Sequence, residues 1–244
     1  MALRRIQVIG SSAASNFSNN PEDKSWPALL RNYYEGALEF EVSIRGGLTP
    51  VRAIDEILNI QPCDILILHL GTSVGWPVPL ASLNQRLGID FEAEHALHQP
   101  AFRSPFFWRR VKGFLKLKSR NAIKYLLFFT GMYRPRINIA ELKEQVDAVL
   151  NLGYTKAPRI IWIQHRALQH RRIFLERAIY SRFYSRIIET LNLRLGPSLA
   201  IITEDQEFLD KKNYLLDYVH LSDGGHREIF DKILEAIDYF ENEA

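Results

Sequence analysis

Two hydrophobic periodicities alternate along the chain, and they predict strands separated by helices. Short runs of apolar or β-branched residues, bounded by turn residues, are typical of strands. They predict strands at Arg5–Ile9, Glu39–Ile44, Asp64–Leu70, Arg159–Gln164 and Ser198–Thr203. Apolar residues at helical spacing predict helices at Trp26–Tyr34, Pro50–Ile60, Ala140–Leu152, Phe174–Leu193 and Ser222–Phe240.

This alternation indicates a parallel sheet with helices on both faces. No internal repeat and no low-complexity linker interrupts it, so we predict a single domain over residues 1–244. Ligands of such sheets bind at the carboxyl ends of the strands. We therefore expect a functional site in the loops that follow Ile9, Ile44, Leu70 and Gln164.

The composition is that of a globular protein, because 47% of the 244 residues are hydrophobic and 11% are aromatic. Cys63 is the only cysteine, so no disulfide can form within the chain, and the apolar residues around it predict a buried thiol. No apolar run reaches the roughly 18 residues of a membrane span, and the N-terminal run is too short for a signal peptide. We therefore expect a cytoplasmic protein.

The net charge of +3 conceals an uneven distribution, because ten Lys and Arg and no Asp or Glu lie between His95 and Ala140. About 70 residues separate Gly71 from the helix at Ala140, where a dozen or so would suffice. We predict a basic helical insertion at about 90–140.

Three interpretations of this basic segment are open. It is a solvated helical surface, a cover that recognises an anionic or sugar substrate through Arg109, Arg110 and Lys112, or a contact with an anionic membrane surface. Nucleic-acid binding is disfavoured, because no recognition fold is present and the total charge is small.

Two short motifs near opposite ends of the chain carry candidate chemistry. Gly10-Ser11-Ser12 follows the first strand and presents a hydroxyl where a serine nucleophile would be needed, although a plain loop or helix cap would have the same sequence. Asp217 and His220 lie three residues apart before the last helix. In a bent loop the carboxylate would orient the imidazole and leave its other nitrogen as a base, although a surface turn has the same spacing.

The other histidines do not form a convincing metal site. His95 and His98 have a spacing that suits zinc, but only Glu92 and Glu94 are near them, and no Cys-x-x-Cys or His-Glu-x-x-His occurs. We expect no metal and no cofactor. His69, within an apolar strand, is interpreted as a core histidine, and His226 as a packing residue of the last helix.

Four sequence blocks, in the expected order, resemble those of the SGNH (GDSL-like) hydrolases. VIGSSAAS stands where the family has a strand followed by Gly-Asp-Ser, so the nucleophile maps to Ser12. SIRGGLTP offers Gly46 and Gly47 for the glycine of the second block, and we favour Gly47 because the family glycine precedes a Thr-containing helix start. LILHLGTSVG fits the third block at Gly71. DYVHLSDGGH closely matches the last block, Asp-x-x-His followed by Gly-His, and is the most specific of the four.

The resemblance implies a three-layer α/β/α fold with a flavodoxin-like parallel sheet of about five strands. It also implies a triad of Ser12, His220 and Asp217, with an oxyanion hole formed by the backbone N–H groups of Ser12 and Gly47 and the side chain of Ser73. Two positions depart from the family: Ser11 replaces its aspartate, and Ser73 replaces its asparagine. Loss of one oxyanion donor typically costs about 10²–10³ in rate.

The function that this implies is a serine esterase, with a small acyl ester or a carbohydrate O-acyl ester, such as an O-acetyl group, as substrate. One alternative is an O-acyltransferase that uses the same serine on a glycan or metabolite. Another is a non-catalytic binding module with a degenerate oxyanion hole. Release of p-nitrophenol from an activated ester separates the binding module from the enzymes, and partition of the acyl group between water and sugars separates hydrolysis from transfer.

Overall fold

A computed structural model describes residues 4–15, 23–70, 77–79, 126, 129–130, 133–135, 137–164, 174–203, 213 and 220–242 of the chain. Residues 77–79, 133–135, 174–178 and 180 are described by their backbone alone. None of the helices in these ranges is long and apolar enough to cross a membrane.

Five parallel strands form the central sheet, in the order β2-β1-β3-β6-β7. Their bounds are β1 (Arg5–Gly10), β2 (Glu39–Ile44), β3 (Ile65–Leu70), β6 (Arg159–Gln164) and β7 (Leu199–Thr203). The order and the parallel pairing confirm the predicted flavodoxin-like sheet. The predicted strand bounds differ from the observed ones by one residue at most.

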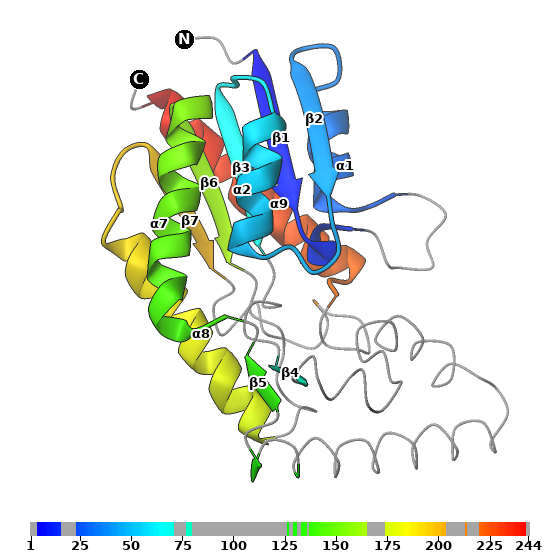
Figure 1. Ribbon diagram of the computed structural model, residues 1–244. Helices are drawn as coiled ribbons and strands as arrows, with labels where there is room; N and C mark the ends of the chain where they lie inside the picture. The colour runs from blue at the N-terminus through cyan, green and yellow to red at the C-terminus, as the bar shows by residue number, and fades with distance from the viewer. Residues whose placement is uncertain are drawn as a thin grey trace, which may run out of the picture.

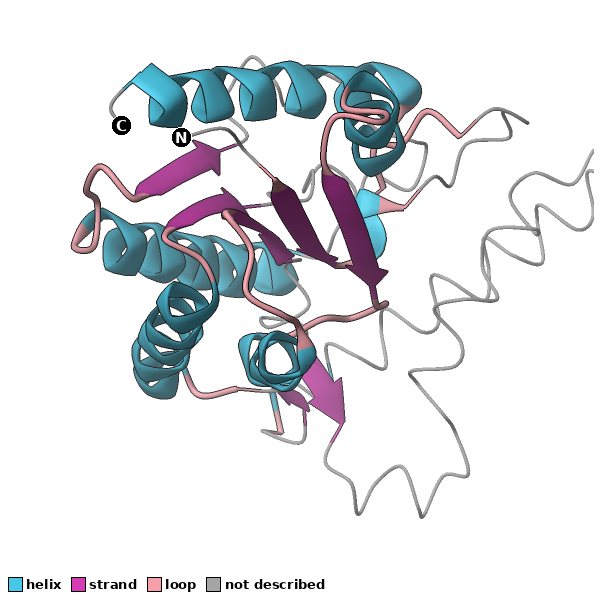
Figure 2. Cartoon of the chain, turned by 90° about the horizontal axis from the view of Figure 1, so that it is seen from above, coloured by secondary structure: helices cyan, strands magenta, loops and turns pink. Residues whose placement is uncertain are grey.

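Helices cover both faces of the sheet and make it the middle of three layers (Figures 1 and 2). One face carries α1 (Trp26–Tyr33) and α9 (Asp223–Asn242), and the other carries α2 (Pro50–Asn59), α7 (Ile139–Lys156) and α8 (Phe174–Asn192). The predicted helices are confirmed, although α7 continues four residues beyond the predicted end at Leu152.

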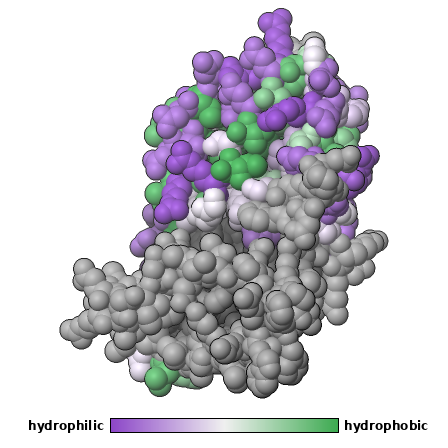
Figure 3. Space-filling view, turned by 90° about the vertical axis from the view of Figure 1, so that its right-hand side faces the viewer, coloured by the Kyte–Doolittle hydropathy of each residue, from purple (hydrophilic) through white to green (hydrophobic). Residues whose placement is uncertain are grey.

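Alternate side chains of the central strands feed the two cores. Ile65 and Ile67 of β3 belong to the cluster under α1 and α9, whereas Leu66 and Leu68 belong to the cluster under α2, α7 and α8. All six positions of β3 are buried, which explains why this strand has the most continuous apolar run. At the edge of the sheet, β2 is only half-buried, and Figure 3 shows hydrophobic and hydrophilic side chains mixed on this side.

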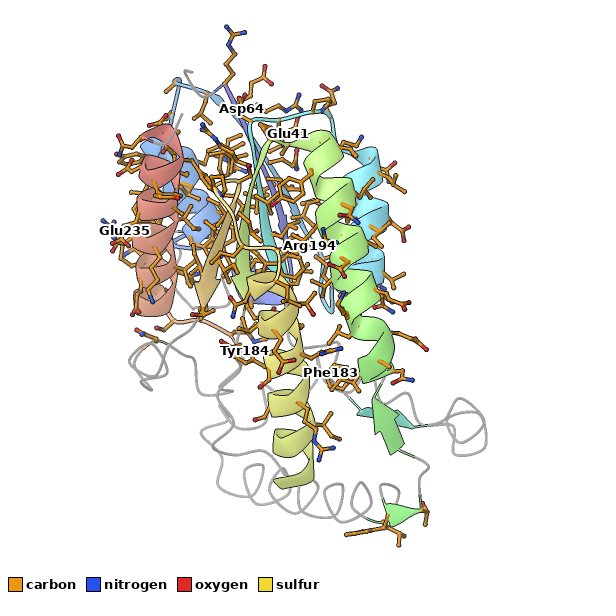
Figure 4. All side chains as sticks on the ribbon, turned by 90° about the vertical axis from the view of Figure 1, so that its left-hand side faces the viewer. Glu41, Asp64, Phe183, Tyr184, Arg194 and Glu235 are labelled. Carbon is orange, nitrogen blue, oxygen red and sulfur yellow. The ribbon has the colours of Figure 1, made fainter. Side chains whose placement is uncertain are left out.

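Charged groups gather where the strands begin, at the amino-terminal edge of the sheet. The Asp64 carboxylate accepts hydrogen bonds from the backbone N–H groups of Arg4 and Arg5, both at 2.8 Å. The Arg5 guanidinium pairs with Glu41, and Figure 4 shows Glu41 and Asp64 at the same end of the sheet. The Cys63 thiol beside them is 7% exposed, and burial raises its pKa to about 11. The predicted buried thiol is therefore confirmed.

A second, short sheet joins β4 (Pro77–Pro79) and β5 (Tyr133–Pro135) in antiparallel pairing. Pro77 lies opposite Pro135, so the chain leaves and returns at neighbouring positions around residues 80–132. The predicted insertion at about 90–140 lies largely outside the described residues and stays a prediction.

Candidate active site

Ser12 begins a tight turn at the carboxyl end of β1, the strand next to the central strand β3. The strand ends at Gly10, and Ser12–Ala14 form the 3₁₀ helix η1. A Cβ on Gly10 would lie 2.9 Å from the Cβ of Ala14, so the turn folds back on the strand only because this residue is glycine. Ser12 is half-buried at the tip of this turn.

Ser11, which stands at the family's aspartate position, has a structural role in this turn. It is buried, and its backbone N–H donates to the carbonyl of His69 at 2.8 Å, which ties the turn to β3. Its hydroxyl accepts from the Ala13 N–H at 3.4 Å and so caps η1. The hydroxyl therefore serves the turn that presents Ser12.

Gly47 lies in the loop after the neighbouring strand β2. Its φ of +65° is in the left-handed region, and a Cβ there would meet no atom within 4 Å. Conformation rather than crowding therefore requires glycine at this position. Gly46, the other glycine of the block, has no positive φ.

The loop that carries Gly47 is fixed at both ends. The Arg45 N–H donates to the Gly10 carbonyl at 2.8 Å, and the Arg45 guanidinium pairs with Glu56 of α2 at 2.7 Å. Thr49 caps α2 through its hydroxyl, which accepts from the Arg52 N–H at 3.4 Å. This loop and the Ser12 turn are thus attached to the same strand end.

His220 precedes α9, and α9 starts at the carboxyl edge of the sheet (Figure 1). Ser222 begins the helix: its hydroxyl accepts from the Gly225 N–H at 3.2 Å, and its carbonyl accepts from the His226 N–H at 2.9 Å. Leu221 is fully buried, which anchors the backbone next to the half-buried His220.

Asn213 fastens the other end of the segment that carries His220. Its carbonyl accepts from the Ser222 N–H at 3.0 Å, and its side chain donates to Glu228 of α9 at 2.7 Å. Gly225 packs so closely against Asn213 that a Cβ on residue 225 would overlap the Asn213 carbonyl oxygen. Residues 213 and 222, which bracket positions 217 and 220, are therefore held together at the start of α9.

The structure describes Ser12, Gly47 and His220 among the predicted site residues. Asp217, Ser73, Arg109, Arg110 and Lys112 lie outside the described residues, as does Gly71 of the third block. Their predicted roles stay predictions. Among the described residues, no group of three or more His, Cys, Asp or Glu side chains could hold a metal ion.

The site also contains supporting residues that no sequence motif connects. His69 and His226 are fully buried, as their interpretation as packing residues predicts. Both accept hydrogen bonds from Trp26: its indole Nε1 donates to His69 Nδ1 at 3.2 Å and its backbone N–H to His226 Nδ1 at 3.4 Å. Trp26 starts α1 next to Pro27, and this helix-start pattern is the only local signal at that position.

No protein-family model matches the chain, and no curated protein is significantly similar to it in sequence. Solved structures are similar over nearly the whole chain. A member of the lipolytic G-D-S-L family from Veillonella parvula superposes with a TM-score of 0.54 at 12% identity, covering 95% of this chain and 97% of the other.

Two further structures give the same result. A lipase/acylhydrolase from Enterococcus faecalis has a TM-score of 0.57 at 13% identity, covering 96% of this chain and 95% of the other. An acetyl xylan esterase from Geobacillus stearothermophilus has a TM-score of 0.57 at 11% identity, covering 98% of both chains. The chain therefore has the fold of the GDSL lipolytic hydrolases, the family that its sequence blocks resemble.

Proposed function

We propose that the protein is a serine hydrolase that cleaves esters, with Ser12 as nucleophile, His220 as base and Asp217 as the carboxylate that orients His220. One observation carries the proposal. The Ser12 turn, the Gly47 loop and the start of α9 come from three distant parts of the chain, and all lie at the carboxyl edge of one sheet. The shared fold with lipases and esterases supports it.

In the proposed acylation step, the Ser12 hydroxyl attacks the ester carbonyl while His220 takes its proton. The backbone N–H groups of Ser12 and Gly47, with the Ser73 hydroxyl, hold the oxyanion that forms. Collapse of this intermediate breaks the ester C–O bond. His220 then gives its proton to the departing alcohol, leaving the acyl group on Ser12.

Deacylation repeats these roles with water. His220 removes a proton from the water as its oxygen attacks the acyl carbonyl, and the Ser12 oxygen leaves with the proton that His220 returns. The products are a carboxylic acid and the free enzyme. A fixed serine at the end of a buried strand suits this sequence of steps, since the nucleophile stays in place through both.

For the substrate, we propose a small acyl ester or an O-acetyl group on a carbohydrate. The similarity to an acetyl xylan esterase supports the carbohydrate ester. The ten cations between His95 and Ala140 favour an anionic substrate or contact with an anionic membrane surface. We assign Arg109, Arg110 and Lys112 to this recognition.

A fluorophosphonate probe tests the nucleophile directly, because it forms a covalent bond only with an activated serine. We expect the wild type to be labelled at Ser12 and Ser12→Ala not to be labelled. Ser15→Ala, a substitution at the other end of η1, is the matched control and should be labelled like the wild type. Absence of labelling in an intact wild type would favour the binding module.

The cations are tested by replacing Arg109, Arg110 and Lys112 together with Gln. Hydrolysis of an anionic acyl ester should fall while that of a neutral ester is kept, and the difference should shrink in salt, because exposed charges are screened over about 10 Å at 0.1 M. Loss of binding to anionic liposomes alone would instead favour the membrane contact. No change in either assay would favour the interpretation of this segment as a solvated helical surface.

A further inference from the structure

We propose that Trp26, together with His69 and His226, is a positioning residue of the active site: it forms a buried hydrogen-bonded bridge that fixes His220 relative to Ser12. This inference rests on the proposed function. It deepens that function by naming the residues that join the nucleophile to the base. None of the three touches the reacting atoms in the proposed mechanism.

The first half of the bridge runs from the nucleophile to the indole ring. Ser11 holds the turn of Ser12 through its N–H, which donates to the His69 carbonyl at 2.8 Å. The imidazole of the same histidine accepts from Trp26 Nε1 at 3.2 Å, and the two rings lie 5.8 Å apart with a tilt of 42°. His69 therefore contacts the nucleophile turn with its backbone and Trp26 with its side chain.

The second half runs from Trp26 to the base. The backbone N–H of Trp26 donates to His226 Nδ1 at 3.4 Å, and the backbone N–H of His226 donates to the Ser222 carbonyl at 2.9 Å. Ser222 is two residues from His220, with the fully buried Leu221 between them. Four hydrogen bonds thus lead from Ser11 to Ser222.

Burial makes each of these hydrogen bonds costly to lose. Trp26, His69 and His226 are each 0% exposed, so no surface water replaces a bond that is broken. Both imidazoles accept at Nδ1, which requires the neutral ring with its proton on Nε2. The bridge is therefore directional and uncharged, and it requires a donor on the Trp26 ring and an acceptor at Nδ1 of each histidine.

The bridge joins segments that are far apart in the sequence, so it can determine how they are placed relative to one another. Trp26 is 43 residues from His69 and 200 residues from His226, so no local backbone structure enforces these contacts. A displacement of about 1 Å between catalytic groups can cost about 10²-fold in rate. Loss of the bridge should therefore slow the chemical step more than it weakens substrate binding.

The experiment compares two tryptophans. Trp162 of β6 is the matched control for Trp26, because both are 0% exposed and both donate from Nε1 at 3.2 Å. The Trp162 bond goes to Gln164 within its own strand and does not enter the bridge. Trp26→Phe and Trp162→Phe thus remove the same ring N–H from opposite layers of the core.

We expect similar falls in Tm for the two variants but different kinetics with p-nitrophenyl acetate. Trp26→Phe should lower kcat by about 10- to 100-fold with KM within about twofold of wild type, and slow fluorophosphonate labelling by a similar factor. Trp162→Phe should keep both rates. Equal kcat in the two variants would overturn the inference, because Trp26 would then act only on stability.

A second pair of variants keeps the test independent of the indole. His226→Asn keeps an acceptor the same number of bonds from the backbone as Nδ1, whereas His226→Leu has none. We expect His226→Asn to restore most of the kcat that His226→Leu loses. Equal kcat for both would count against the bridge.

The experiments distinguish a failure of this inference from a failure of the proposed function. An active, labelled wild type with a fully active Trp26→Phe overturns the bridge alone. A folded wild type that neither hydrolyses the ester nor reacts with the probe overturns the proposed function and the bridge with it.

Discussion

The two edges of the sheet are held together by different kinds of interaction. At the amino-terminal edge, the Asp64 carboxylate holds the backbone of Arg4 and Arg5, and Arg5 pairs with Glu41. At the carboxyl edge, the hydrogen bonds that link the Ser12 turn to the start of α9 join uncharged groups, and Trp26, His69 and His226 among them are fully buried. The interactions at the two edges differ in charge and also in how strongly their energy depends on distance and angle.

Partly exposed ion pairs tolerate small movements, because water screens them and their energy changes slowly with geometry. Buried hydrogen bonds between neutral groups weaken steeply when distance or angle changes. The amino-terminal edge can therefore contribute stability without fixing positions closely. The hydrogen bonds through Trp26 fix positions at the carboxyl edge without adding a further charge beside the proposed site.

The largest expected difference between the edges is in catalysis. We predict that His220→Ala lowers kcat for an activated ester by about 10⁴-fold or more, because members of a triad act as a unit. Its Tm should stay close to that of the wild type, since His220 is only half-buried. Steady-state kinetics and calorimetry check this, and wild-type turnover in the variant would remove His220 from the mechanism.

Gly225→Ala should affect both catalysis and stability at the carboxyl edge. The new Cβ overlaps the Asn213 carbonyl oxygen, and such overpacking typically costs about 1–3 kcal/mol of unfolding free energy. Because Asn213 fastens the segment of His220, we also expect a kcat about 10²-fold lower.

Gly224→Ala is the control for this variant, because Gly224 is an exposed residue in the same helix turn. It should be neutral or slightly stabilising. Urea unfolding and ester hydrolysis measure the two effects. A Gly225→Ala protein with normal kcat would show that the segment of His220 does not depend on this contact.

Asp64→Asn, at the amino-terminal edge, should lower stability without affecting catalysis. The substitution weakens two hydrogen bonds from the Arg4 and Arg5 N–H groups, so we expect the unfolding free energy to fall by about 1–2 kcal/mol. The kcat should not change. Asp55→Asn, which removes the same charge from an exposed position on α2, serves as the control for net charge. A fall in kcat would show that the two edges are coupled.

The effect expected to be smallest at neutral pH is that of Cys63, because its thiol changes stability only in alkaline solution. Burial raises the pKa of its thiol to about 11, so the folded state favours the neutral thiol. Stability from this group is complete below the unfolded pKa of about 8.5 and is lost as the pH rises through about 11. The stability advantage of the wild type over Cys63→Ala should therefore shrink between these values. A constant difference in urea unfolding would contradict the raised pKa.

The fold could be predicted because buried strands and helix starts leave recognisable patterns in the local sequence. Every position of β3 is buried, and its run of Ile and Leu shows this without any other information. Thr49 followed by Pro50 marks the start of α2 in the same direct way. The predicted end of α7 is too early, because its last turn contains Gly153 and Thr155, which are weak helix formers. Gly153 is buried there against Ile160 of β6, a contact that the local sequence does not show.

The candidate site could be predicted only in part, because its residues depend on contacts between distant segments. Ser12, Gly47 and His220 were found through block patterns. The role of Trp26 depends on a hydrogen bond across 200 positions, and a single sequence contains no signal of such a pairing. The sequence shows only that Ser11 replaces the family's aspartate, and its role as the cap of η1 is visible only in the folded turn.

The cover of β1 by α9 has a consequence for biosynthesis. Ile6 and Val8 of β1 enter the same apolar cluster as Ile229 and Ile233 of α9, so β1 is completed by a helix that is made after all five strands of the sheet. A nascent chain that has not reached Asp223 lacks His226 and has only α1 on this face of its sheet, which leaves apolar surface exposed to chaperones and to aggregation. Translation must therefore pass α9 before this face of the sheet can be fully covered in a ribosome-bound copy.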